Sequence, residues 1–450
     1  SDYLGALKDA DYWQAQPSLD DNQGAILDGP EYLNFMNFEA AGSAVTYDSN
    51  SFAPDSASTA TSISTGHKTY SGSINVDESG TIEYETIAEQ LKAQKGWEIG
   101  VITSVNLNHA TPAAFYAHQA SRSSYYEIGL ELVESGFDYF AGGGLLKPTG
   151  SSGDQTDLYE LAQEAGYTVA KTHAEADAIG TNTEKAIIID EDLADSDAMA
   201  YELDRTDDMW ALADYVAKGI EVLDNDTGFF MMCEGGKIDW ACHANDAASS
   251  IHDTQALADA VQVAIDFAKE HADETLILVT GDHETGGLTI GFAGTDYDTY
   301  LDLLENQKIS FAKYDSDYVA SYKANKTPFE TVLADIEKLF GLKAQGEEGD
   351  KLVLTAYEME QLRAAYEKSI NGTASSQYDQ AEYVLYGTYE PLSVTITHII
   401  NNKSGISFTS YSHTGLPVAV LAEGAGSEMF NGYYDNTDIY NKLAELTNVK

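Results

Sequence analysis

Short apolar runs that alternate with amphipathic helical patterns constrain the fold of this chain more than any other feature. The runs that predict strands are 98–103, the residues around Tyr139, 186–189, 228–233, 275–280 and 417–421. Helical periodicity lies between them, as over 86–92 and 208–222. Continuously apolar strands are buried on both faces, and strands that alternate with helices form parallel sheets. We therefore expect an α/β fold with a central, largely parallel sheet flanked by helices.

The segment 291–393 differs from the rest of the chain in composition. It is rich in Tyr, Lys, Glu and Asp, and it has helical patterns over 328–339 and 355–370. We expect this segment to be an insertion that caps the sheet. The catalytic core would then consist of residues 1–290 and 394–450.

The charge of the chain excludes some classes of partner. The 450 residues include 74 acidic and 24 basic ones, which gives a formal net charge of −50. Such a protein has few cations to exchange for counterions, so we expect no nucleic acid or anionic membrane as partner. No apolar run is long enough to cross a bilayer. Two cysteines, Cys233 and Cys242, are too few for a disulfide scaffold, and they could pair or stay as buried thiols.

Acidic residues and histidines gather beside four predicted strands. The clusters that follow a strand are 108–122, 234–243 and 282–283, and the cluster at 412–415 precedes one. Imidazole and carboxylate together suit Zn²⁺, whereas carboxylate with hydroxyl and water suits Mg²⁺. Asp239 and His243 would share one face of a helix. Asp282 and His283 are adjacent, so they can bind one ion only where the backbone is extended or kinked.

The stretch PDSASTATSISTGHKTY at 54–70 concentrates small hydroxyl residues behind a strand-like run at 43–47. Asp55 predicts the cap of a helix that begins near Ser56. Ser56 would then lie at the positive end of the helix, which favours a phosphate. By itself the pattern favours a hydroxyl-rich surface helix over a nucleophile. A metal site nearby favours the nucleophile, because a metal makes the alkoxide accessible.

The motif Asp-Ser-Ala-Ser-Thr-Ala-Thr at 55–61 resembles the nucleophile motif of the alkaline phosphatases. The segments 109–122, 234–243, 282–283 and 413–415 extend the resemblance over most of the chain, in the order of the family. The resemblance implies hydrolysis of phosphate monoesters through a phosphoserine on Ser56. It implies that Arg122 binds two phosphate oxygens and that Asp55 orients Arg122. It also implies a homodimer and a periplasmic or secreted location.

The resemblance further implies two Zn²⁺ ions and one Mg²⁺ ion. The expected ligands are Asp239, His243 and His413 for one zinc, Asp282 and His283 for the second, and Glu234 and Thr111 for magnesium. The first zinc would stabilise the leaving-group oxygen and activate water, and the second would bind the Ser56 oxygen. His109 and Trp240 stand near the phosphate at positions that vary within the family, so metal preference and rate depend on them. Packing is an equally good explanation for Trp240.

The amino terminus departs from the family pattern. Members begin with a buried strand and an Asp-Gly-Met-Gly-like turn, whose Asp bridges the second zinc and the magnesium. This chain begins Ser-Asp-Tyr-Leu-Gly, which resembles the helix after that turn. We expect that an N-terminal piece of the natural protein, with that strand and ligand, is missing from the sequence. Asp28, in an Asp-Gly-Pro turn, is the only substitute nearby.

Other functions stay open at this point. A sulfatase or phosphodiesterase relative would use the same scaffold, and a chain without the bridging Asp could bind metal and phosphate without turnover. A Ser-His-Asp hydrolase is disfavoured, because no Gly-x-Ser-x-Gly elbow surrounds Ser56. Comparing the hydrolysis of monoesters, diesters and sulfate esters would separate the enzymatic alternatives.

Overall fold

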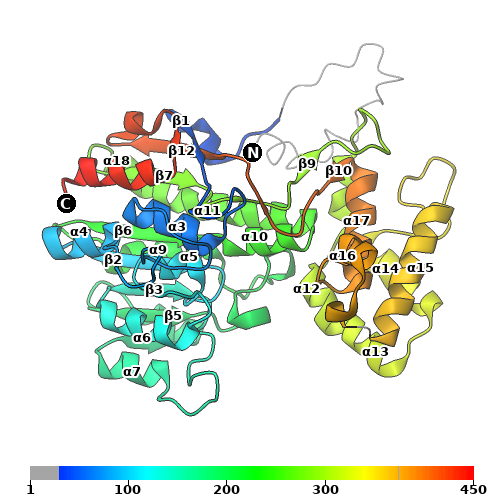
Figure 1. Ribbon diagram of the computed structural model, residues 1–450, viewed down its shortest axis with the longest axis horizontal. Coiled ribbons are helices and arrows are strands. Elements are labelled where there is room, and N and C mark those ends of the chain that lie inside the picture. The colour runs from blue at the N-terminus through cyan, green and yellow to red at the C-terminus, as the bar shows by residue number, and fades with distance from the viewer. Residues whose placement is uncertain (1–29, 373) are drawn as a thin grey trace.

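A computed structural model describes residues 30–372 and 374–450, and its main body is an α/β layer structure (Figure 1). The larger sheet has five parallel strands in the order β4-β5-β3-β2-β6. These strands are β2 (Glu98–Thr103), β3 (Tyr139–Gly142), β4 (Thr168–Ala170), β5 (Ala186–Ile189) and β6 (Phe229–Glu234). The predicted α/β fold with a parallel sheet is confirmed; β2, β3, β5 and β6 begin within one residue of the predicted strands, and β4 was not predicted.

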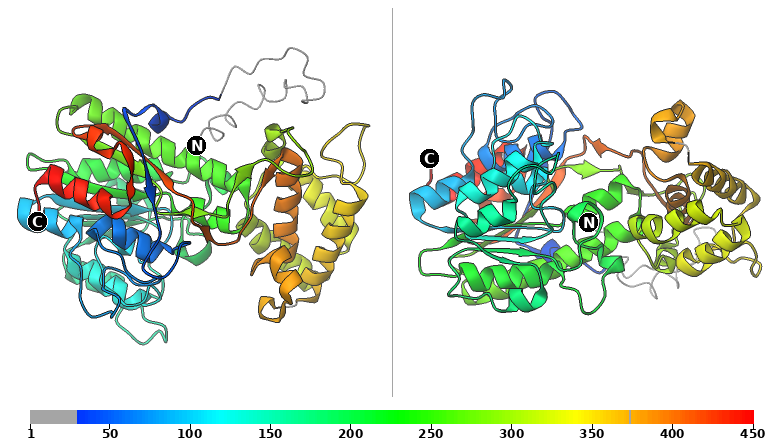
Figure 2. Two further views of the ribbon diagram at one scale, coloured as in Figure 1. Left: turned by 45° about the horizontal axis from the view of Figure 1, so that its top comes forward. Right: turned by 90° about the horizontal axis from the view of Figure 1, so that it is seen from below.

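Helices cover both faces of this sheet (Figure 2). Successive side chains of a strand point to opposite faces, so each strand feeds two cores. Val101 and Phe140 are buried in the core on one face, and Ile102 and Ala141 are buried in the core on the other. The first core is closed by α4 (Ile87–Lys95), α6 (Tyr125–Ser135) and α7 (Leu158–Glu164), and the second by α9 (Leu212–Leu223) and α11 (Ala247–Glu270).

A second sheet has four strands in the order β13-β1-β12-β7. They are β1 (Ala40–Val45), β7 (Leu276–Thr280), β12 (Val418–Gly424) and β13 (Gly432–Asp435). Strand β12 runs antiparallel to both β1 and β7, whereas β1 and β13 are parallel, so this sheet is mixed. The beginning of β12 therefore lies at the same edge as the end of β7. This direction explains how the cluster at 412–415, which precedes its strand, still reaches the edge where the other clusters follow theirs.

Helix α11 joins the two sheets. Its residues Leu257 and Ala260 pack in the core that contains β6, while Ala258 and Val261 pack with Ile277 of β7. Within 30–372 and 374–450, β6 pairs only with β2 and β7 pairs only with β12. Both strands are thus edge strands that lie on one helix and direct their carboxyl ends to one site.

Helices from the chain between β9 (Thr289–Ile290) and β10 (Ile406–Ser407) form a separate body with its own core, at the right of Figure 1. They are α12 (Phe311–Tyr314), α13 (Ala320–Asn325), α14 (Phe329–Phe340), α15 (Ala356–Asn371), α16 (Gln380–Tyr386) and α17 (Pro391–Ser404). Helices α14 and α15 match the two helices predicted for this segment. Ala247 and Ile251 of α11 pack into the same core and tie this body to the main one. The division at residues 291 and 393 stays a prediction.

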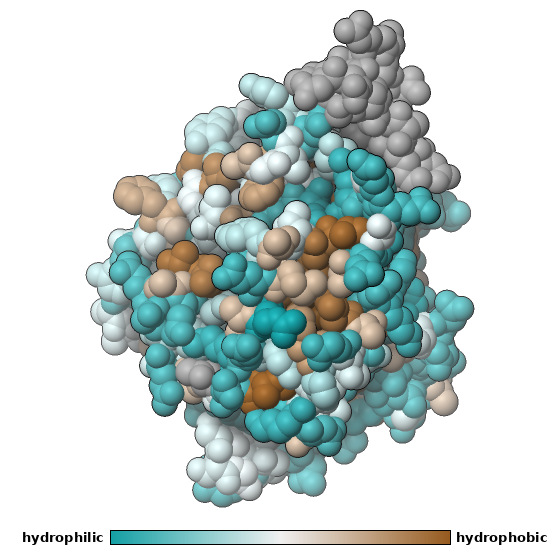
Figure 3. Space-filling view, turned by 90° about the vertical axis from the view of Figure 1, so that its right-hand side faces the viewer, coloured by the Kyte–Doolittle hydropathy of each residue, from teal (hydrophilic) through white to brown (hydrophobic). Residues whose placement is uncertain are grey.

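The face seen in Figure 3 is largely hydrophilic, with a group of apolar residues near its centre. None of the helices in the described part of the chain is long and apolar enough to cross a membrane. The sequence left open whether Cys233 and Cys242 form a disulfide or stay as thiols, and in the structure both are free thiols.

Candidate active site

The nucleophile motif folds as the sequence predicts. Helix α3 (Ser56–Thr65) begins at Ser56, and Asp55 is its extended N-cap residue. The Asp55 carboxylate accepts hydrogen bonds from the backbone N–H groups of Ser58 (3.1 Å) and Gly72 (2.9 Å). Ser56 is buried, and its Oγ lies 2.9 Å from Nε2 of His283. The hydroxyl therefore stands at the helix N-terminus, where the macrodipole favours an anion.

One side of Ser56 is formed by Arg122, Asp55 and His109. Nη1 of Arg122 donates to Asp55 Oδ2 at 2.8 Å, and Nη2 lies 3.1 Å from His109 Nε2. A guanidinium can only donate, so His109 Nε2 accepts and Nδ1 carries the hydrogen. Burial, together with the charge of Arg122, lowers the pKa of His109 to about 3, which keeps the ring neutral.

The same guanidinium controls the charge of Asp55. Burial by itself raises the pKa of the Asp55 carboxyl. The charge of Arg122 and the hydrogen bond from Gly72 outweigh burial and lower this pKa below its usual range. This side of the site therefore holds a matched pair of opposite charges.

The other side is assembled from three separate segments. Helix α10 (Gly236–His243) carries Asp239 and His243 on one face, as the spacing of four predicts. The two-residue strands β8 (Glu284–Thr285) and β11 (His413–Thr414) pair with His413 opposite Thr285. This pairing stacks the rings of His283 and His413, whose centroids are 3.5 Å apart.

Asp239, His243 and His413 place three ligand atoms in a tight triangle. Nε2 of His243 lies 3.1 Å from Nε2 of His413, and these atoms lie 3.4 Å and 3.5 Å from Asp239 Oδ1. Nδ1 of His243 faces the carbonyl oxygen of Tyr411, and Nδ1 of His413 faces that of Pro54. A carbonyl only accepts, so both Nδ1 atoms donate, and the two Nε2 atoms that face each other are the ones that a cation could bind.

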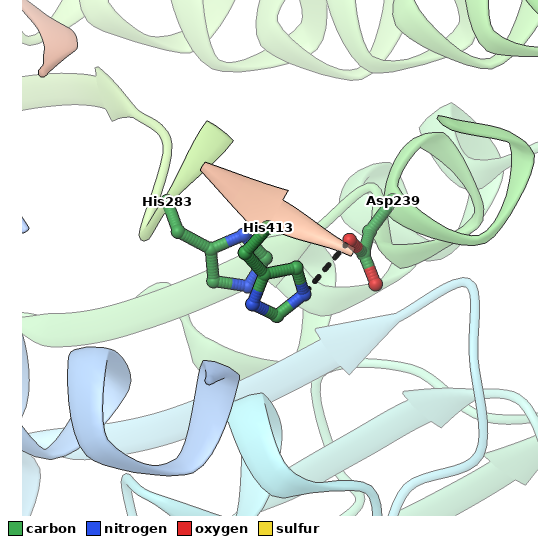
Figure 4. A group of neighbouring side chains, drawn as sticks. All are labelled: Asp239, His283 and His413. Atoms are coloured by element: carbon green, nitrogen blue, oxygen red, sulfur yellow. Dashed lines mark ion pairs between the residues drawn. The ribbon is translucent and has the colours of Figure 1, made fainter. Parts of the chain in front are cut away.

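Three acceptor atoms at such distances fit a shared cation. Zn–N bonds of about 2.0–2.1 Å in a tetrahedron give edges of about 3.3 Å, close to the three distances observed. Figure 4 shows Asp239, His283 and His413 turned toward one another, and their ligand atoms all lie within 4.8 Å. The imidazole and carboxylate donors are those that zinc prefers. The two predicted ligand sets thus adjoin each other, because His283 belongs to the second.

Asp282 and His283 follow β7 in non-helical backbone, which is the condition that their adjacency requires. His283 Nε2 lies 3.1 Å from Asp282 Oδ2. Burial lowers the pKa of His283, but the carboxylates of Asp282 and Asp239 raise it to about 9. Burial raises the pKa of Asp239, yet the imidazoles of His413, His243 and His283 around it hold this pKa well below its usual range.

Glu234 ends strand β6 and accepts a hydrogen bond from Thr103 at 2.5 Å. Thr111 also hydrogen-bonds to it. Burial and the neighbouring charges of Asp282 and Asp239 raise the pKa of Glu234 to about 7, which the two hydroxyls partly offset. Glu234 and Thr111, the predicted magnesium ligands, therefore adjoin each other beside the other acidic groups. Asp28 lies outside the described residues.

Hydroxyl groups donate hydrogen bonds to the acidic residues of the site, and most of these hydroxyl groups were not predicted from the sequence. Thr285 donates to Asp239 at 2.5 Å, and Thr59 donates to Asp282 at 3.2 Å. Thr103 does the same for Glu234. Thr285 follows His283 by two residues, so a search for hydroxyls near the expected ligands would have found it. Thr59 lies within the nucleophile motif itself.

These residues surround a cavity of about 350 Å³. Its lining consists of Ala53, Pro54, Asp55, Ser56, Ser71, His109, Arg122, Asp239, Trp240, His243, Ser412 and His413. Eight of the sequence-predicted residues line it, and the remaining described ones, Glu234, Thr111, Asp282 and His283, are not part of that lining. Trp240 meets His109 edge to face, with ring centroids 5.7 Å apart.

Comparison with known proteins agrees with this geometry. A family model for alkaline phosphatase matches residues 10–449. Alkaline phosphatases 4 and 3 of Bacillus subtilis are 31% and 32% identical to this chain, over 87% and 86% of it and 76% and 75% of their own lengths.

Solved structures are similar over nearly the whole chain. The cold-active alkaline phosphatase of Shewanella sp. is 27% identical, with a TM-score of 0.75 over 98% of this chain and 96% of that one. The enzyme of the Antarctic bacterium TAB5 is 26% identical, with a TM-score of 0.63 over 93% and 91%. The chain belongs to the alkaline phosphatase family and is a phosphatase that acts on phosphate monoesters.

Proposed function

We propose that the chain hydrolyses phosphate monoesters through a phosphoserine on Ser56, at a site that holds two zinc ions and one magnesium ion. The observation that carries the proposal is the position of Ser56 Oγ. It stands at the N-terminus of α3, 2.9 Å from His283 Nε2. Arg122 lies on one side of the cavity, and the acceptor triangle, which is formed by Asp239, His243 and His413, lies on the other. A tetrahedral anion in the cavity would meet a nucleophile, a guanidinium and cation ligands together.

Arg122 binds two non-bridging oxygens of the phosphate through its planar fork. Asp55 takes Nη1 and so fixes the rotation of the guanidinium, at 2.8 Å. Ser56 Oγ loses its proton to solvent and attacks phosphorus. The bond from phosphorus to the ester oxygen breaks on the opposite side, and this oxygen leaves with the electron pair and takes up a proton from water. Water then attacks the same phosphorus, the bond to Ser56 Oγ breaks, and phosphate leaves.

The metal ligands divide as the family implies. Asp239, His243 and His413 would hold one zinc, Asp282 and His283 the second, and Glu234 with Thr111 the magnesium. The donor set supports this division, because imidazoles gather at the first two groups and a carboxylate with hydroxyls at the third. When bound, such cations neutralise the charge that develops on the oxygens entering and leaving phosphorus. A mutant of the TAB5 enzyme is described with Mg bound in its M3 site, which agrees with magnesium chemistry in this family.

Family membership also supports a homodimer and a location outside the cytoplasm, and both remain proposals. Sedimentation velocity of the purified protein tests the first. A single species at twice the mass of 48.7 kDa is expected.

The experiment that tests the function is hydrolysis of a chromogenic phosphate monoester at alkaline pH. The protein is stripped with chelator and then resupplied with Zn²⁺ and Mg²⁺, and matched diester and sulfate ester substrates are run beside it. We expect activity that disappears and returns, highest for the monoester. Ser56→Ala should keep its metals and form no phosphoenzyme. Undiminished turnover by Ser56→Ala would refute the nucleophile, and a preference for diester or sulfate ester would refute the substrate class.

A further inference from the structure

A fully buried lysine lies beside the site and has no part in the proposed reaction. Lys237 stands on the first turn of α10, three residues before Trp240, and its side chain is 0% exposed. Its Nζ lies 2.7 Å from Asp195 Oδ1. A buried ammonium costs free energy unless it is paired, so the contact with Asp195 holds the Lys237 side chain in one place.

The ammonium of Lys237 contacts two aromatic rings. Nζ lies 3.8 Å from the ring centroid of Tyr201 and 5.0 Å from that of Trp240. Both distances are within the range of cation–π attraction. Tyr201 is buried, whereas Trp240 is only partly buried and lines the active-site cavity. The contacts of the Trp240 ring with Lys237 and with its neighbours therefore help to fix its position at the cavity wall.

Trp240 connects this buried charge to the phosphate side of the site. Its ring meets that of His109 at 73°, with centroids 5.7 Å apart. His109 Nε2 in turn accepts from Arg122 Nη2 at 3.1 Å. The sequence of contacts therefore runs from Lys237 through Trp240 and His109 to the guanidinium.

We propose that Lys237 is a positioning residue, which holds Trp240 against His109 and so orients Arg122 for phosphate. The proposal rests on the proposed function, because it takes Arg122 as the phosphate-binding group. Lys237 does not line the cavity, so its effect on the reaction passes through Trp240. The sequence left open whether Trp240 packs or acts in the site. In this proposal it acts in the site through its packing against Lys237 and His109.

The test compares Lys237→Met and Lys237→Arg with the wild type, all loaded with Zn²⁺ and Mg²⁺. The KM for a chromogenic monoester and the inhibition constant of inorganic phosphate should rise about three- to tenfold in Lys237→Met, with a smaller change in kcat. Lys237→Arg keeps the charge and should restore most of the affinity. Lys92→Met is the matched control, since Lys92 pairs with Asp138 at 2.8 Å away from the site. It should lower stability without changing either constant.

A double-mutant cycle shows whether Trp240 is the intermediary. In a Trp240→Leu background, Lys237→Met should produce no further rise in the inhibition constant of phosphate. The proposal would be overturned if the two substitutions raised the phosphate inhibition constant independently, so that their factors multiply in the double variant. It would also be overturned if Lys237→Met left KM and the phosphate inhibition constant unchanged.

If Lys237→Met does not fold, Asp195→Asn removes one partner of the ammonium from a side chain that is 41% exposed. It should raise the phosphate inhibition constant in the same direction by a smaller factor, and no change would overturn the proposal. A wild type that neither hydrolyses monoesters nor binds phosphate would refute the proposed function and this inference together. An active wild type with a normal Lys237→Met would refute this inference alone.

Discussion

The two sides of the active-site cavity satisfy their charges in different ways. On one side Arg122 pairs with Asp55 at 2.8 Å and donates to His109, so every strong charge has its opposite within the chain. On the other side Asp239, His243 and His413 face one another with acceptor atoms 3.1–3.5 Å apart. The first side balances its charges within the chain, and the second would do so with the cation proposed above. Under the proposed function, the difference teaches that folding organises the first side and metal binding organises the second.

Metal removal should give the largest effect and separate the two sides most clearly. Chelation should abolish monoester hydrolysis and lower the melting temperature, because the acceptor triangle loses the charge that holds it together. The matched variant His243→Ala/His413→Ala should lack activity from the start, and chelator should lower its melting temperature less than it lowers that of the wild type. Differential scanning calorimetry with and without chelator measures this. Equal shifts in both proteins would contradict a cation at the triangle.

Substitution of Arg122 should act on the opposite side and leave the metals in place. Arg122→Ala removes the phosphate-binding fork, and kcat/KM should fall on the order of a hundredfold. Arg122→Lys keeps the charge without the fork, so its kcat/KM should lie between those of the wild type and Arg122→Ala. Metal content by mass spectrometry is the control, and it should equal that of the wild type. Loss of zinc from Arg122→Ala would show that the two sides are not separate.

Thr285 tests whether a hydroxyl on the metal side orients its carboxylate. Thr285→Val removes the donor to Asp239 at 2.5 Å while keeping the shape of the side chain. Zinc affinity should fall about ten- to a hundredfold, with activity regained at high zinc. Thr285→Ser keeps the hydroxyl and is the control. A zinc titration in which Thr285→Val behaves as the wild type would remove Thr285 from the site's support.

The Asp55 carboxylate should make the phosphate side sensitive to acid. Its pKa is lowered in the folded protein, so its stabilisation is present above the pKa of the unfolded chain and is lost as pH falls through the folded pKa. Asp55→Asn keeps a capping side chain but not the charge, and it should cost about 1–3 kcal/mol at neutral pH. Urea unfolding at neutral pH and near pH 3 measures this, and the gap between wild type and variant should narrow in acid. A gap independent of pH would contradict the ion pair.

Local features of the site could be predicted because neighbouring residues encode them. Asp55 before a run of small residues predicted the helix start at Ser56, and the helix begins there. The spacing of Asp239 and His243 predicted a shared helical face, which α10 provides. Hydrophobic runs predicted the beginnings of β2, β3, β5, β6, β7 and β12 to within one residue, whereas the run at 43–47 begins three residues after β1 does, and β4 and β13 were not predicted. Each of these depends on contacts within one turn or one strand.

Direction and pairing of distant segments could not be predicted in the same way. His413 precedes its strand, and only the antiparallel direction of β12 brings it to the edge where β7 ends. The separation of the strands into a parallel and a mixed sheet is likewise absent from the local pattern. An apolar run looks the same in either direction, because burial depends on side chains and not on chain polarity.

The sequence by itself determined the elements of this protein, the residue types of its site and its resemblance to a family. Only the tertiary structure decided that His243 and His413, 170 residues apart, turn their Nε2 atoms to each other at 3.1 Å. It also decided that Arg122 divides its donors between Asp55 and His109, and that Lys237 is buried against Trp240. The physical reason is that periodicity records which side chains are buried, whereas the partner of a buried polar group is chosen by packing among segments far apart in the chain.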